Sequence, residues 1–128
     1  MKWMCAMTAA TLLACAIAAT APDRAAAQAA GGDAKAQAQE IFKNRCTPCH
    51  GPTGKGDGPA SAGLTPPPRN YGDPAWQKSV TDDQIEKVIK YGGAAVGKSP
   101  AMPANPDLTA KPQVVTELKN IVRGFGAK

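Results

Sequence analysis

The chain has 128 residues, enough for one small domain, and 43% of them are hydrophobic, much of that share being alanine. Aromatic residues make up only 5%, so a core built from side chains alone would leave the domain marginal, which favours a protein that builds its core around a cofactor. The net charge of +5 is too small and too scattered along the sequence to indicate a nucleic-acid-binding protein.

Residues 1–27 have the pattern of a secretory signal peptide. Lys2 gives a positive start, residues 3–21 carry no charge, and cleavage is expected after Ala27, although a cut two or three residues later would also suit the peptidase. Two alternatives stay open: an uncleaved membrane anchor, which the abundant alanine disfavours, and lipid attachment at Cys15, which the apolar residues beyond it disfavour. The pattern predicts export to the periplasm.

Removal of the signal would leave few side chains able to bind a metal or react. Two of the four cysteines and three of the four methionines leave with it, so the exported chain holds Cys46, Cys49, one histidine (His50) and one methionine (Met102). The charge falls from +5 to +4, a mild excess that suits an acidic protein partner.

A first helix is predicted over residues 33–45, with Asp33 as its N-cap and with Ala38 and Phe42 on one face. Residues 28–32, ahead of it, are expected to form a flexible lead-in. The helix runs directly into the Cys-x-x-Cys-His sequence.

Residues 51–70 contain five glycines and five prolines, a composition that predicts a long loop wrapped around something. A short helix should follow, with Asp73 as N-cap and Pro74 at its first position. The next helix is predicted to start at a capping box formed by Thr81 and Gln84.

That helix should end at Gly92, and a second proline-containing loop is predicted over residues 94–108. A last amphipathic helix is expected over residues 110–123. No alternating strand pattern is present, so residues 33–128 are predicted to form a single all-α domain.

The pentapeptide Cys46-Thr47-Pro48-Cys49-His50 is the attachment signature of a c-type haem. Two thiols three residues apart at a helix end can reach the two vinyl groups of one porphyrin and form thioethers. The adjacent histidine is then placed under the iron as its proximal ligand.

Three alternatives compete for these side chains. A thioredoxin-like redox pair needs a βαβ setting, which the sequence lacks. A structural zinc site needs four ligands, whereas Cys46, Cys49 and His50 supply three. A simple disulfide is possible but has no need of His50.

Met102 is the predicted sixth ligand of the iron. It lies in a loop between two helices, with Pro100, Pro103 and Pro106 nearby to restrict the backbone. A lone methionine is more often core filler, but filler usually lies on a helix face. With a haem present and no second histidine, axial ligation is the favoured interpretation.

These features resemble class I c-type cytochromes, in particular small bacterial monohaem ones, over nearly all of the exported chain. The resemblance implies a cytochrome c fold, with three to four main helices around one covalently attached haem. The matching parts are Phe42 four residues before Cys46, the Cys-x-x-Cys-His site, the Gly54-x-Gly56-Asp57-Gly58-Pro59 stretch, and Met102-Pro103 ahead of the last helix.

The resemblance also implies a helix crossing near the haem, where Ala38 and Phe42 of the first helix meet the last one. An alanine stands in place of the usual glycine, and Ile121 stands where an aromatic residue is common.

Further site residues follow from the same resemblance. Pro59 is expected to offer its carbonyl to the ring N–H of His50, which would fix the tautomer of the ligand. Trp76 and Arg69 resemble residues that bind haem propionates, the alternatives being a core tryptophan and a solvated arginine.

An iron ligated on both sides has no open site for substrate, so the sequence predicts an electron carrier and not an enzyme. The expected role is a monomeric one-electron shuttle between redox proteins, which touches membranes only through membrane-bound partners. The alternatives are a haem subunit of a larger oxidoreductase and, less favoured, an open-site haem enzyme or gas sensor. Four basic residues either steer an acidic partner or are ordinary solvated side chains: Lys43, Arg45, Lys55 and Lys98.

Overall fold

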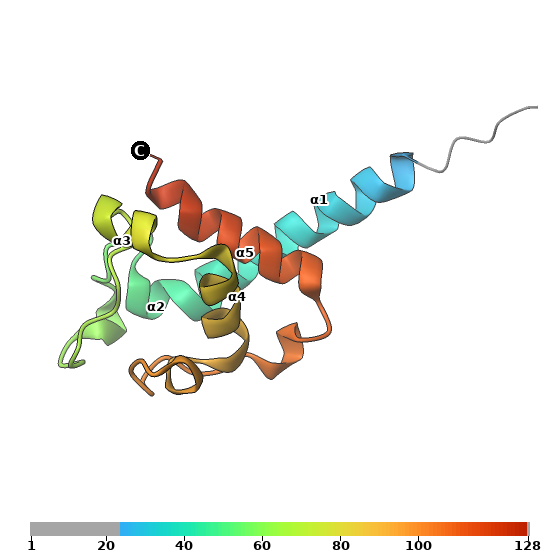
Figure 1. The fold of residues 1–128 in the computed structure, drawn as a ribbon. Coiled ribbons are helices and arrows are strands. Elements are labelled where there is room, and N and C mark those ends of the chain that lie inside the picture. Colours follow the sequence, from blue (N-terminus) through green and yellow to red (C-terminus); the bar gives the residue numbers. More distant parts are fainter. Residues whose placement is uncertain (1–23, 128) are drawn as a thin grey trace, which may run out of the picture.

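The structure, a computed structural model, describes residues 24–127, with side chains from Gly31 onward; most of the expected signal peptide lies outside this range. The described part is helical and contains no strand, which confirms the all-α prediction (Figure 1). The main helices are α1 (Arg24–Ile41), α2 (Thr47–His50), α3 (Pro74–Ser79), α4 (Asp82–Tyr91) and α5 (Pro112–Phe125), with a π-helical turn at Phe42–Cys46 and 3-10 turns at Pro59–Ser61, Ala94–Val96 and Pro106–Leu108.

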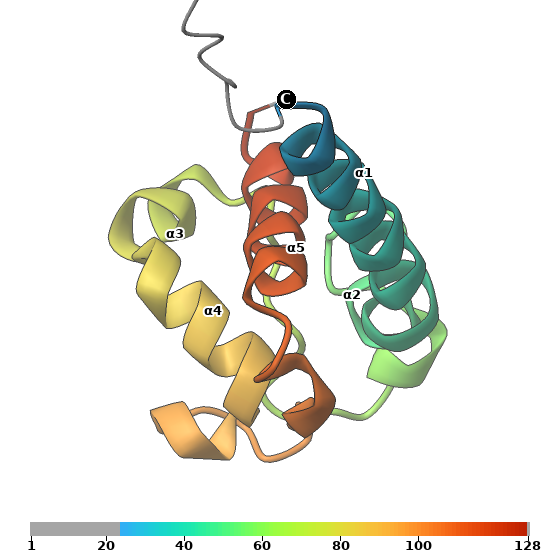
Figure 2. The ribbon, with the colours of Figure 1, turned by 90° about the vertical axis from the view of Figure 1, so that its right-hand side faces the viewer.

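The first and last helices cross, as expected, and their contact forms much of the core (Figures 1 and 2). Ala38 is completely buried in this core and Leu118 of α5 is nearly so. A methyl side chain at Ala38 leaves room for another helix to approach closely. The aromatic partner of Phe42 is Phe125, with ring centroids 5.6 Å apart, so the aromatic residue missing at Ile121 is supplied one turn later.

α4 packs on α5 from another side and completes the core. Ile85 and Ile89 of α4 are buried, as are Val115 and Val122 of α5. Burial of each such aliphatic side chain contributes roughly 1.5–3 kcal/mol. The helices thus form one apolar core, at one end of which the cysteine-bearing turn is attached.

The start of α1 differs from the prediction. Residues 28–32, expected to be a flexible lead-in, lie within α1 and are helical. Alanine, the strongest helix former, occupies five of the nine positions in residues 24–32 and carries the helix through Gly31 and Gly32, where glycine costs only about 1 kcal/mol each. The expected cleavage site at Ala27 lies within this helix and remains a prediction.

The end of the first helix is also irregular, because residues 42–46 form a π turn. The amide of Thr47 donates to the carbonyl of Phe42, five residues back, and the Thr47 hydroxyl donates to the same oxygen at 3.1 Å. Pro48 has no N–H, and its ring would collide with the carbonyl of Asn44 in a regular α-helix. A wider turn accommodates this proline, and such turns often occur at functional sites.

Two of the three predicted N-caps are confirmed, whereas Asp33 lies inside α1 and does not cap it. The Asp73 carboxylate accepts from the amides of Ala75 (2.9 Å) and Trp76 (3.4 Å) at the start of α3. At the start of α4 the Thr81 hydroxyl accepts from the amide of Gln84, and the Gln84 side chain accepts from the amide of Thr81.

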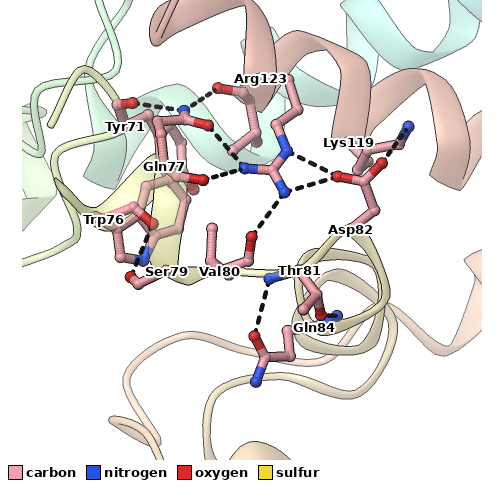
Figure 3. A network of polar contacts seen from close by, with 11 residues as sticks. Tyr71, Trp76, Gln77, Ser79, Val80, Thr81, Asp82, Gln84, Lys119 and Arg123 are labelled. Carbon is pink, nitrogen blue, oxygen red and sulfur yellow. Dashed lines mark hydrogen bonds and ion pairs between the residues drawn. The ribbon is translucent and has the colours of Figure 1, made fainter. Parts of the chain in front are cut away.

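Arg123 of α5 fastens the corner between α3 and α4 (Figure 3). Its guanidinium donates to the carbonyls of Gln77 and Val80, each at 2.8 Å, and to the carboxylate of Asp82. The side-chain amide of Gln77 donates in turn, through Nε2, to the carbonyl of Tyr71 at 2.7 Å. This corner therefore fixes the point where the long glycine-rich loop ends.

The last helix runs over Pro112–Phe125 and not 110–123. Proline is favoured at the first helical position, which explains the later start. The helix continues past Gly124 because the ring of Phe125 packs against Phe42 and Tyr71.

Candidate haem-binding site

The attachment turn, residues 46–50, joins the π turn to α2. Cys46 and Cys49 are free thiols and partly buried, whereas His50 is 7% exposed. Gly51 follows with a φ of 75°, and its amide donates to the carbonyl of Thr47. The left-handed conformation at Gly51 ends the helix at once, so the chain turns away directly after the histidine.

The attachment loop (residues 51–70) folds back onto this turn through its own backbone. The amide of Gly56 donates to the carbonyl of His50 at 2.8 Å, and that of Gly58 to the carbonyl of Cys49 at 3.1 Å. A side chain at Gly58 would collide with the carbonyls of Thr47 and Pro48. Glycine is therefore required where the loop contacts α2.

The orientation of His50 is set by this returning loop. Its Nδ1 lies 3.3 Å from the carbonyl oxygen of Arg69, a geometry in which Nδ1 carries the proton and donates it. Burial lowers the pKa of His50, and the bond to Arg69 opposes this only in part. The ring is therefore neutral near pH 7, with the lone pair of Nε2 free to bind a metal.

This geometry corrects the role expected of Pro59. The carbonyl that accepts from the His50 ring belongs to Arg69, while Pro59 begins a 3-10 turn and is exposed. The reason is the path of the loop: the amide of Tyr71 bonds to the carbonyl of Gly54 at 2.7 Å, which brings residue 69 back under the ring. The sequence offers no side-chain signal for this bond, because the acceptor is backbone.

Tyr71 is a site residue that the sequence analysis missed. It is 7% exposed and its ring stacks on His50, with centroids 4.4 Å apart and an angle of 14° between the planes. Trp76 lies beside it at 5.6 Å. A large aromatic residue at the end of a loop made mostly of glycine and proline was the signal that could have identified it.

The surroundings of the Cys46 thiol do not favour redox exchange. Burial raises the pKa of the Cys46 thiol to about 11, against the smaller opposing effect of the Arg45 charge. A thioredoxin-like pair depends on a lowered thiol pKa, so the structure disfavours that alternative. Within residues 24–127 no group of three or more His, Cys, Asp or Glu side chains is arranged to hold a metal ion.

The residues of the turn fit a covalently attached haem. Two disulfide-free thiols lie beside an imidazole whose tautomer leaves Nε2 available. Phe42, Tyr71 and Phe125 supply apolar and aromatic surface next to it.

The remaining predicted site residues lie around this centre. Met102 is partly buried and lies on the methionine loop (residues 92–108). Arg69 is exposed, and Trp76 packs against the core. The described hydrogen bonds and ring contacts join neither Met102 nor Pro59 to His50. Ligation by Met102 and propionate binding by Trp76 and Arg69 remain predictions.

No helix within residues 24–127 combines the length and the apolar character needed to cross a bilayer.

The sequence pattern of one protein family, described as cytochrome c oxidase, cbb3-type, subunit III, matches residues 33–120. This range is more than half of the chain and contains the attachment turn, both loops and most of α5. No curated protein and no solved structure matches the chain. The chain therefore belongs to this family: it is an all-α class I cytochrome c domain, of the kind that carries covalent haem c and transfers electrons.

Proposed function

We propose that the chain holds one haem c through thioethers at Cys46 and Cys49, with His50 and Met102 as axial ligands. In this proposal it is exported to the periplasm and works as a monomeric one-electron shuttle between redox proteins. When bound, the haem supplies a one-electron couple between ferrous and ferric iron.

The observation that carries the proposal is the orientation of His50. Its Nδ1 donates to the carbonyl of Arg69, so Nε2 is the free nitrogen, on the same short helix as Cys49. The hydrogen bond also increases the electron density of the imidazole, a usual way in which proteins adjust a bound metal. His50 is 7% exposed and Tyr71 stacks on its ring, so little water reaches this side.

Two features support Met102 as the second axial ligand. It is the only methionine after residue 7, and its backbone is fixed on both sides, since its amide donates to Ser99 and its carbonyl accepts from Gly93. A thioether ligand favours the ferrous state and raises the potential. Two protein ligands leave no coordination site for a substrate, which is the basis for an electron carrier and not an enzyme.

The exposed side chains suit redox partners with acidic surfaces. Lys43, Lys55 and Lys98 are exposed, and the exported chain carries a small positive charge. Attraction between such surfaces speeds association and depends on ionic strength. Membrane contact would then occur through a membrane-bound partner.

The family match favours a second candidate function, a haem-carrying subunit of a larger oxidoreductase. The family's own description names an oxidase subunit. Gel filtration of native extract separates the two: a shuttle elutes at the size of the free chain, whereas a subunit co-elutes with its complex.

An optical spectrum of the exported protein, with a haem stain after denaturing electrophoresis, tests the main proposal. We expect covalent haem in the wild type, a single remaining thioether in Cys46→Ala or in Cys49→Ala, and loss of covalent haem when both cysteines are replaced. We expect Met102→Ala to keep the covalent haem but to lower the midpoint potential by about 0.1 V or more. A colourless exported protein would refute haem attachment, and an unchanged spectrum in Met102→Ala would refute that ligand.

A further inference from the structure

Arg45, the residue directly before Cys46, reaches across to the methionine loop. Its Nη1 lies 2.9 Å and 3.0 Å from the two carboxylate oxygens of Asp107 and 3.3 Å from Oδ1 of Asn105. The side chains of Arg45 and Asp107 are about half exposed, at 45% and 46%. The bridge thus links two parts of the chain that are 62 residues apart.

Asn105 is bound on its other side to the end of α4. Its Nδ2 donates to the carbonyl of Ile89 at 2.8 Å, and its amide donates to the carbonyl of Lys90 at 3.0 Å. The same side-chain amide therefore connects α4 with Arg45. Asn105 forms a junction between the attachment turn, the methionine loop and α4.

The other end of the methionine loop is closed onto the same helix end. The amide of Gly93 donates to the carbonyl of Met102 at 3.0 Å, and the amide of Lys98 donates to the carbonyl of Gly93 at 2.8 Å. These bonds fix the shape of the loop and its attachment to α4. The Arg45 bridge joins the loop directly to the residue before Cys46.

We propose that Arg45 is a positioning residue, which with Asn105 and Asp107 holds the methionine loop at a fixed place relative to the attachment turn. Through this bridge it keeps Met102 in reach of the iron. The inference rests on the proposed ligation by Met102. It also removes Arg45 from the residues available to steer a partner, because its guanidinium is occupied by its own chain.

The experiment uses the haem-loaded protein with Arg45→Gln, Asp107→Asn, the double variant, and Arg45→Lys. Added imidazole displaces a methionine ligand each time the loop opens, so its apparent affinity for the ferric protein reports loop opening. Amide hydrogen exchange over residues 97–105 reports the same opening without any assumption about the ligand. Lys87→Gln, which removes an exposed pair with Asp83 within α4, is the matched charge control.

We expect Arg45→Gln to bind imidazole about two- to fivefold more tightly and to exchange these amides faster by a similar factor, as befits loss of a half-exposed bridge. The double variant keeps the wild-type net charge but lacks the bridge, so it should stay as open as Arg45→Gln. Arg45→Lys should recover part of the effect, and Lys87→Gln should match the wild type.

Three results would overturn the inference. In one, the double variant behaves like the wild type, which would assign the effect to charge alone. In another, Arg45→Gln matches Lys87→Gln in both measurements. In the third, exchange accelerates while imidazole binding is unchanged, so the bridge holds the loop but not the ligand. An unchanged spectrum in Met102→Ala would instead refute the proposed function, with the exchange result still testing the bridge.

Discussion

The two glycine- and proline-rich loops are fastened to the molecule in different ways. The attachment loop bonds through its backbone to α2, at the carbonyls of Cys49 and His50, and its exit at Tyr71 is held by Gln77. The methionine loop bonds through its backbone to the end of α4. It reaches the attachment turn through the exposed side chain of Arg45.

The difference shows that the two sides of the proposed haem site are stabilised separately. The histidine side belongs to the same backbone network as the cysteines, so a change there affects haem attachment itself. The methionine side depends on α4 and on a screened ion pair, so it can open while the rest of the fold persists. The two axial ligands should therefore differ in how easily they are lost.

The largest expected effects come from adding a methyl group at a crowded glycine in each loop. Gly58→Ala would collide with the backbone of α2, and Gly93→Ala would collide with the carbonyl of Ser99. Each should destabilise the protein by roughly 3 kcal/mol, measured by denaturant unfolding. Gly58→Ala should also reduce haem attachment, whereas Gly93→Ala should keep the haem and lose methionine ligation.

Gly124→Ala is the matched control for both, since an added methyl there meets nothing within 4 Å. It should raise the free energy of unfolding by about 0.5–1 kcal/mol, because alanine favours the helix. Equal haem loss in the Gly58 and Gly93 variants would show that the loops are not independent.

A smaller effect is expected from Arg123→Ala, which removes the clamp at the exit of the attachment loop. The carbonyls of Gln77 and Val80 would lose a charged donor in a partly buried place, at a cost of roughly 2 kcal/mol. Thermal unfolding measures the loss, and hydrogen exchange should rise around Tyr71. Faster exchange in the methionine loop, with unchanged exchange at Tyr71, would contradict the conclusion that the two loops are stabilised separately.

The cap of α3 gives a still smaller effect at the same corner. Asp73→Ala removes the acceptor for two amides and should cost about 1 kcal/mol. Asp73→Asn keeps an acceptor oxygen and should retain most of the stability. If both variants unfold at the same temperature, charge and not capping is responsible.

Lowering the pH should produce the smallest change in stability, and it should act through both Asp82 and Asp107. Hydrogen bonds from Arg123 and Lys119 hold the pKa of Asp82 below its ordinary value of 3.8, and a bond from Arg45 does the same for Asp107. A lowered carboxyl pKa contributes stability that is complete above the ordinary pKa and is lost as the pH falls through the lower folded value. Unfolding free energies measured as the pH is lowered from about 5 should fall less steeply in Asp82→Asn and in Asp107→Asn than in the wild type. Parallel pH profiles in all three proteins would show that these ion pairs do not cause the loss of stability in acid.

Local signals explain what could be predicted from the sequence. The caps at Asp73 and Thr81, the helix end at Gly92 and the cysteine motif each depend on neighbours within a few residues. The predictions of these caps, of the helix end and of the all-α fold are confirmed. Haem attachment at Cys46 and Cys49 rests on an equally local pattern and remains a prediction.

Contacts between distant residues explain what could not. The bond from His50 to the carbonyl of Arg69 closes a span of 19 residues, and its acceptor is a backbone atom that any residue would offer. The pairing of Phe42 with Phe125 depends on where α5 ends. Helix periodicity alone leaves the position of that end uncertain by about one turn. The link from Arg45 to Asp107 involves two exposed charges whose partners the sequence does not specify.

The π turn at residues 42–46 has a consequence for how this segment tolerates change. A π turn holds one residue more than an α turn, so it rotates everything after it by about 100° relative to an evenly wound helix. Winding the same sequence evenly would therefore turn both cysteines away from their bearing. Deleting either Lys43 or Asn44 would keep that bearing but would bring the Pro48 ring against the carbonyl four residues back. Both residues are exposed, so substitutions should be tolerated at these two positions, whereas a change of length should not.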